Sequence, residues 1–299
     1  MTRNKLSNLA IAGLVLCILS ILAGAVVRGT GSGDGCGASW PTCNGNIIPD
    51  SSDTSAMIEY THRMLSGVLL LVTFLLFIYC KKYSSNRLLQ KCSRALLFFV
   101  VMEALIGMVI VLQELVAYNT SLTRLIAVPI HLVNTFSLLA IYIVLYSVLK
   151  NNIQQINFLY NKRFLFSCFL FFLVAGFGSI TALADLLYPS ESFIEGVQMD
   201  FATTSQLLTR LRILHPIGAS ILLLWMFSES GRLLRKEGIL FAKNLNRLSI
   251  IVSLVGVLNV FVNINIFLSI LHLLFADALW AVYIYCNTDK AYNLKKQSK

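Results

Sequence analysis

Long apolar stretches, separated by short polar segments, extend along the whole chain. Windows of about 20 apolar residues are long enough to cross a bilayer as a helix, and they predict eight spans in this sequence. Little more than Asn263–Asn265 separates the last two. The pattern predicts an all-α integral membrane protein. The predicted spans are residues 7–27, 61–80, 94–113, 125–149, 163–183, 211–228, 247–264 and 267–286.

Composition supports this fold class. Of the 299 residues, 57% are hydrophobic and only 13% are charged, and the mean hydropathy is +0.75. A soluble domain needs more charge than this to cover its surface. Composition therefore excludes an ordinary soluble globular protein.

The positive charge is distributed unevenly between the two sides of the predicted membrane. The net charge is +10, and 19 of the 24 Lys and Arg residues fall on one side, which also carries both termini. Basic residues mark the cytoplasmic side of a membrane protein and contact anionic lipid, so we expect both termini in the cytoplasm and no nucleic-acid partner. The first span has no convincing cleavage site and no transit peptide precedes it, which favours retention in a bacterial inner membrane. The five basic residues of the other side are Arg28, Arg63, Arg124, Arg210 and Arg212.

The eight spans divide into two similar sets of four. Span two opens HRMLSGVLLL and span six HPIGASILLL, while span four opens HLVNTFSLLA and span eight HLLFADALWA. Because each half has an even number of spans, the halves have parallel topology and are expected to be related by an axis along the membrane normal. We expect two pseudo-symmetric four-helix bundles, residues 1–150 and 151–299.

All four histidines, His62, His131, His215 and His272, lie near the starts of spans two, four, six and eight. These spans run in one direction, so the histidines share one depth near the outer face. Two histidines facing each other across a bundle can provide both axial nitrogens of a haem iron, and two halves would hold two haems. A core histidine bonded to a carbonyl or hydroxyl, or a copper or zinc centre, is the alternative; partners for the latter are sparse.

Other polar residues near this layer are candidate site residues. The outer arginines Arg28, Arg63, Arg124 and Arg212 can pair with haem propionates or simply extend to the interface. Glu59 can act as a general base, a proton carrier or an acid matched to the helix dipole, and the mid-span Glu103 must be neutral or paired. Several glycines would let a flat ligand or another helix approach the backbone: Gly31, Gly33, Gly67, Gly107 and Gly178.

Two cysteines, Cys36 and Cys43, lie in the outer segment GDGCGASWPTCNG. In an oxidising compartment such a short, turn-rich segment can close into a disulfide or a redox-active pair, and unpaired thiols are the alternative. A zinc site is not expected, because no histidine or further cysteine is nearby in the sequence.

Together these motifs resemble the haem A synthase family. The resemblance covers most of the chain and rests on VVRGTGSGDGC-x6-C after span one, EYTHR opening span two, an intramembrane histidine opening spans four and six, and GVLNVF followed by HLLFADALWA. It implies an enzyme that oxidises a porphyrin methyl of haem O to a formyl group, giving haem A for the terminal haem–copper oxidase. Haem O synthase and an electron donor are the implied partners, and a homo-oligomer is possible.

The resemblance also assigns roles to individual residues. It implies that Glu59, His62 and His131 form the substrate half, with Glu59 nearest the chemistry, while His215 and His272 ligate a haem B cofactor. Cys36 and Cys43 match the family's first-loop pair, but the second outer loop has no cysteine pair as many members do. A non-catalytic di-haem cytochrome or haem carrier is the alternative. A prenyltransferase of the haem O synthase type would need aspartate-rich loops, which the sequence lacks.

Overall fold

The computed structural model describes residues 3–297, and side chains as far as Asp289. Within these residues it contains eight helices long and apolar enough to cross a membrane, as the sequence predicts, and no strand beyond an isolated bridge between Cys43 and Asn46. The tail lysines Lys290, Lys295, Lys296 and Lys299 lie outside the described side chains. The α-helices are α1 (Arg3–Gly29), α2 (Thr54–Tyr83), α3 (Arg87–Leu112), α4 (Leu122–Asn151), α5 (Lys162–Leu187), α6 (Phe193–Phe201), α7 (Leu207–Leu211), α8 (Leu214–Arg235), α9 (Lys243–Phe261) and α10 (Ile266–Gln297).

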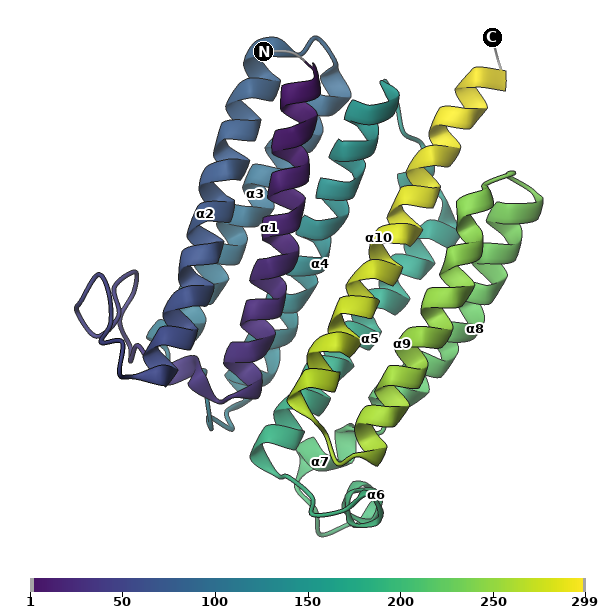
Figure 1. The fold of residues 1–299 in the computed structure, drawn as a ribbon. Coiled ribbons are helices and arrows are strands. Elements are labelled where there is room, and N and C mark those ends of the chain that lie inside the picture. Colours follow the sequence, from purple (N-terminus) through teal and green to yellow (C-terminus); the bar gives the residue numbers. More distant parts are fainter. Residues whose placement is uncertain (1–2, 298–299) are drawn as a thin grey trace.

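Helices α1 to α4 pack around one another, and α5, α8, α9 and α10 form a second group beside them (Figure 1). Both ends of the chain lie at the same end of the molecule. The long segment between α1 and α2 and the short helices α6 and α7 lie at the opposite end, called the loop end below. This arrangement agrees with the predicted even number of crossings.

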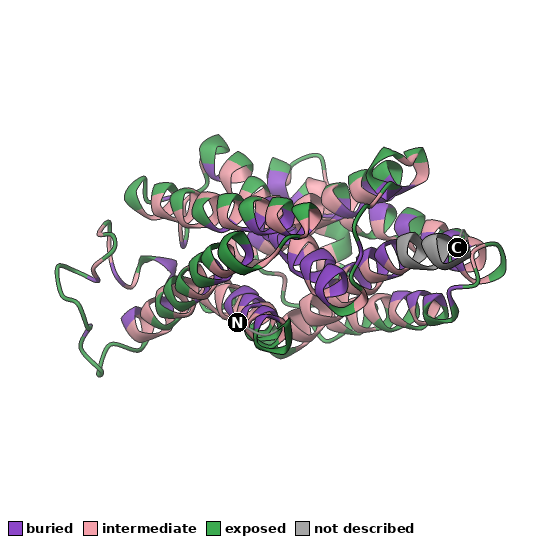
Figure 2. Cartoon of the chain, turned by 90° about the horizontal axis from the view of Figure 1, so that it is seen from above, coloured by how far each residue is buried: buried purple, intermediate pink, exposed green. Residues whose placement is uncertain are grey.

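Helix α4 joins the two groups. It packs against α5 and α10 as well as against its own neighbours, and 56% of its apolar stretch is buried. The indole of Trp280 on α10 donates a hydrogen bond of 2.8 Å to the carbonyl of Phe136 on α4. Seen from above, buried residues concentrate where the groups meet, while the outer faces are exposed (Figure 2). Exposed apolar faces suit a lipid environment, since hydrocarbon is as apolar as those side chains.

Side-chain caps fix where the helices begin. Asp53, Asn86, Ser121 and Asn161 each accept a hydrogen bond from a backbone N–H in the first turn of α2, α3, α4 and α5. Such caps satisfy donors that have no partner inside the helix. Because the Asp53 cap precedes the apolar stretch, α2 begins before the predicted span 61–80. His62 therefore lies well inside α2 and not at its start.

The sixth span is interrupted. The short helix α7 ends at Leu211, α8 begins at Leu214, and Arg212 lies at the break. Pro216 explains it, because a proline ring clashes with the carbonyl four residues earlier, which here belongs to Arg212. Within α8 itself Pro216 falls in the first turn, where a missing N–H is tolerated. Span two has Arg63 where span six has Pro216. The sequence shows this difference but not its effect on the backbone.

Candidate functional site

Three of the four histidines are fixed by the same contact. The Nδ1 of His62 donates to the carbonyl of Ser20 on α1 at 3.1 Å, and the Nδ1 of His215 donates to the carbonyl of Val174 on α5 at 3.1 Å. His272 on α10 contacts the carbonyl of Val252 on α9 at 2.9 Å in the same way. A proton held on Nδ1 leaves the Nε2 lone pair free, which is how proteins orient metal-binding histidines.

A glycine on the neighbouring helix lies against each of these rings. A Cβ atom at Gly24 would lie 3.0 Å from the His62 ring, and one at Gly178 would lie 3.0 Å from the His215 ring. At Gly256 the distance to the His272 ring would be 2.9 Å. In each case the glycine follows the hydrogen-bonding carbonyl by one helical turn. The glycines allow the close approach that brings each ring to the backbone.

His215 and His272 face each other across the second helix group. Their ring centroids are 6.0 Å apart, and their planes are nearly perpendicular, at 83°. Two imidazole nitrogens that each bind one metal at about 2 Å bring their ring centroids about 6 Å apart. The pair therefore has a separation at which both rings would hold one haem iron.

His62 and His131 form the corresponding pair in the first group. They lie within electrostatic range of each other, and both residues are partly exposed. Over the described residues no set of three or more His, Cys, Asp and Glu side chains could hold a metal ion. Two-histidine sites of this kind suit a haem iron, which takes its other four ligands from the porphyrin. A zinc or copper ion would need further protein ligands.

His131 is the exception among the four. Its Nδ1 has no hydrogen-bond partner, and its Nε2 lies 3.5 Å from Oε1 of Glu103 on α3. A Cβ atom at Gly107, one turn after Glu103, would lie 3.8 Å from the His131 ring, farther than at the other three glycines. Glu103 is thus paired, as a mid-span carboxyl requires. The two members of the first pair are held differently.

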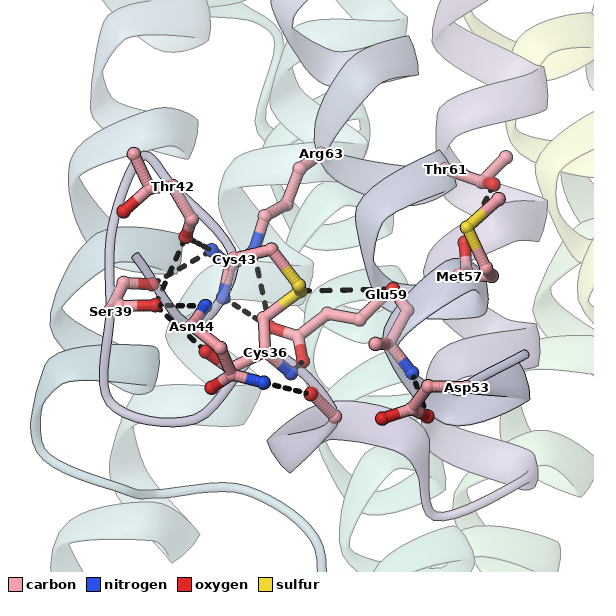
Figure 3. Close-up of a disulfide and its surroundings, with 12 residues drawn as sticks. Cys36, Ser39, Thr42, Cys43, Asn44, Asp53, Met57, Glu59, Thr61 and Arg63 are labelled. Atoms are coloured by element: carbon pink, nitrogen blue, oxygen red, sulfur yellow. Dashed lines mark hydrogen bonds and ion pairs between the residues drawn. A yellow bond between two sulfur atoms is a disulfide. The ribbon is translucent and has the colours of Figure 1, made fainter. Parts of the chain in front are cut away.

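Cys36 and Cys43 form a disulfide, as predicted, and the loop that carries them is held onto α2 (Figure 3). The backbone N–H of Cys36 donates to Oε2 of Glu59 at 2.9 Å, and Arg63 donates to Oε1 of Glu59. Arg63 also donates to the carbonyls of Ser39 and Thr42, both at 2.8 Å. Glu59 is only 3% exposed. The Glu59–Arg63 pair therefore anchors the disulfide loop one helical turn from His62.

Arg212 has a comparable structural role in the second group. Its guanidinium donates to Asp185 at the end of α5, at 2.9 Å, and to Asp200 on α6, at 2.7 Å. The second outer loop has no disulfide, and this buried charge network fixes it instead. Like Arg63, Arg212 has most of its donors bound to protein groups. The sequence did not identify Asp185 and Asp200 as partners of Arg212, because their contact depends on how the loop folds.

Arg28 and Arg124 are better placed to receive an anion. They lie within electrostatic range of each other. Arg124 donates to the carbonyls of Ala117 and Asn119, but its buried Nε has no partner. Arg28, at the end of α1, donates no hydrogen bond to a described residue and has Asp185 within electrostatic range. Of the four predicted arginines, these two donate the fewest hydrogen bonds to protein groups.

Similarity to known proteins extends over most of the chain. Residues 7–284 match the family of cytochrome oxidase assembly proteins. Two Thermus thermophilus proteins named protoheme IX farnesyltransferase are 34% identical over 303 residues, covering 96% of this chain but 48% of theirs. The chain thus spans about half their length. Heme A synthases of Lysinibacillus sphaericus and Bacillus cereus are 36% identical over 99 residues and 40% over 91, covering 33% and 30% of this chain and 32% and 29% of theirs.

The fold and the histidines define a class: a multi-pass helical membrane protein with two pairs of histidines near one end of its helices. Within that class, the chain belongs to the cytochrome oxidase assembly protein family, whose match extends over nearly its whole length.

Proposed function

We propose that the chain is a haem A synthase, which oxidises a porphyrin methyl of haem O to a formyl group and so supplies haem A to a haem–copper oxidase. Membership of the family and the relatives named heme A synthase support this function. The observation that carries it is the repeated histidine arrangement, in which ring, carbonyl and glycine recur in both halves. Such repetition favours two haem sites over four unrelated core histidines.

The two halves would divide the work. His215 and His272 would hold haem B as the cofactor, because both rings are fixed with Nε2 free and their separation suits one iron. A bound haem supplies the redox capacity that amino-acid side chains lack. His62 and His131 would receive the substrate haem O in the other half. The domain boundary at 150/151 remains a prediction of the internal repeat.

Polar residues at the loop end would position the substrate. Arg28 and Arg124 have donors available for propionate carboxylates, which arginine binds well. Glu59 lies one turn from His62 and would take up or deliver protons beside the substrate. Its bonds to Arg63 and to the Cys36 amide would hold the carboxylate in place for that role.

Location and partners follow from the same proposal. The chain would reside in a bacterial inner membrane with its termini in the cytoplasm, its haem sites near the outer face and its exposed apolar faces against lipid. A haem O synthase would supply the substrate. The Thermus thermophilus relatives support this link, because a protein named protoheme IX farnesyltransferase contains a segment similar to 96% of this chain. An unidentified electron donor is the remaining partner. The proposed function needs no nucleic acid and allows a homo-oligomer.

Haem extraction tests the function directly. The chain is expressed in cells that make haem O but not haem A, and extracted haems are identified by mass. We expect haem A with the native chain and only haem O with His62→Ala, which lacks a substrate ligand. If the native chain accumulates to normal levels and no haem A forms, the enzyme assignment is wrong and a di-haem electron carrier becomes the better account.

A further inference from the structure

The contact between His131 and Glu103 separates one histidine from the other three. His62, His215 and His272 each have Nδ1 bonded to a carbonyl. His131 has no such bond, and the carboxylate of Glu103 lies beside its Nε2 at 3.5 Å. The nitrogen that is free in three histidines is therefore next to an anion in the fourth.

Glu103 is fixed in this position by α4. The amide of Asn134 donates to Oε2 of Glu103, and the hydroxyl of Thr135 donates to Oε1. Asn134 also donates to the carbonyl of Phe99 on α3, at 2.9 Å. Asn134 and Thr135 lie one helical turn after His131, so one turn of α4 carries both the ring and the groups that hold its carboxylate partner. The Glu103 carboxylate is thus held in place beside the ring.

The position of the carboxylate affects which tautomer His131 adopts. A neutral imidazole has one N–H and one lone pair, and only the lone pair binds a metal. A carbonyl at Nδ1 places the proton there and leaves Nε2 ready for iron. A carboxylate at Nε2 favours the proton on Nε2, which blocks that nitrogen. Glu103 and an iron atom would therefore compete for the same nitrogen of His131.

This competition fits a site that must exchange its haem. A cofactor site gains from two fixed ligands, whereas a substrate site must release its product after each turnover. We propose that His131 is a releasable ligand, that Glu103 is the positioning residue that makes it so, and that His62 alone fixes substrate haem in the first half. The inference rests on the proposed function in one respect, the assignment of the first half to the substrate.

Haem transfer from the purified full-length chain to excess apomyoglobin tests the proposal, with haem B loaded into both halves as the probe. We expect a fast phase from the first half and a slow phase from the second. Glu103→Gln removes the charge but keeps the size of the side chain. It should slow the fast phase about fivefold, because a neutral amide attracts the Nε2 proton less than a carboxylate does, and a charged partner is worth roughly twice a neutral one. Asp277→Asn is the control, since Asp277 is a buried carboxyl that forms no hydrogen bond and no ion pair with a histidine.

A spectroscopic measurement gives an independent outcome. Electron paramagnetic resonance of the ferric protein should show a high-spin fraction that falls in Glu103→Gln and is unchanged in Asp277→Asn. His62→Ala should empty the first half, while His131→Ala should leave haem bound there in high-spin form. An unchanged or faster fast phase in Glu103→Gln, or equal haem loss in the two histidine variants, would overturn the proposal. Neither measurement requires turnover, so absence of haem A in cells would count against the proposed function alone.

Discussion

At the residue scale, the glycines beside the histidine rings are as informative as the histidines. Gly107 and Gly178 stand out in the sequence as points of close approach, and both lie against histidine rings. Gly24 and Gly256 do not stand out there, because an isolated glycine in an apolar helix has many explanations. The carbonyls that fix the rings carry no sequence signal at all. The sequence thus identified the four histidines as candidate ligands but did not show how their orientation is set.

Gly256→Ala should disturb the second site specifically. Its Cβ would lie 2.9 Å from Cε1 and 3.1 Å from Nδ1 of His272, so the ring must move away from the Val252 carbonyl. Losing the hydrogen bond that orients a metal-binding histidine costs about 10- to 100-fold in affinity. Purified Gly256→Ala protein should therefore contain much less haem B, as measured by pyridine haemochrome.

Gly67→Ala provides the control for that experiment. Gly67 also lies in a transmembrane helix, but a Cβ there would meet no atom within 4 Å. Its haem content should equal that of the native chain. Native haem content in Gly256→Ala would show that His272 does not need its present position to hold the cofactor.

At the element scale, two independent interactions hold the loop between α1 and α2. The disulfide closes it on itself, and the Glu59–Arg63 pair ties it to α2. The sequence predicted the disulfide as one of several possibilities. It also identified Glu59 and Arg63 as candidate site residues, but not their contact with the loop. A hydrogen bond between a side chain and a distant backbone amide depends on how the loop folds back, which residue patterns do not specify.

Reduction of the disulfide should loosen the loop unevenly. The disulfide closes a loop with a sequence separation of 7. Removing it should destabilise the closed loop by about 2 kcal/mol, which makes local opening about 30-fold more frequent. Amide hydrogen exchange should therefore accelerate by that order at Cys43 and Asn44. It should accelerate less at Cys36, whose amide is bonded to Glu59. A Cys36→Ser/Cys43→Ser variant should show no further change on reduction. Equal acceleration at Cys36 and Cys43 would mean that Glu59 does not anchor the loop.

At the scale of the whole molecule, the sequence predicted most of the architecture. The eight spans, the shared end of the two termini and the grouping of helices follow from hydrophobic length and charge distribution, which are strong signals in a membrane chain. The helix bounds and the break at Arg212 follow from caps and from Pro216, which are local effects that a hydrophobic window averages away. The helix α6 and the charge network around Arg212 were not predicted, because they depend on tertiary contacts.

The asymmetry between the halves gives the molecule its proposed division of labour. In the second half both histidines are fixed by carbonyls, whereas in the first half one is fixed and the other faces Glu103. A duplicated fold can in this way hold one haem permanently and process another. The internal repeat alone did not distinguish the halves in this respect, since all four histidines occupy similar sequence positions.

The low-spin spectrum of the purified protein tests this division most directly. We compare the full-length native chain with His215→Ala and with His131→Ala, each isolated from cells that supply haem B. The account predicts that His215→Ala loses the low-spin haem B signal, while His131→Ala retains it. Full retention of that signal in His215→Ala, or its loss in His131→Ala, would contradict the assignment of the second half as the cofactor site.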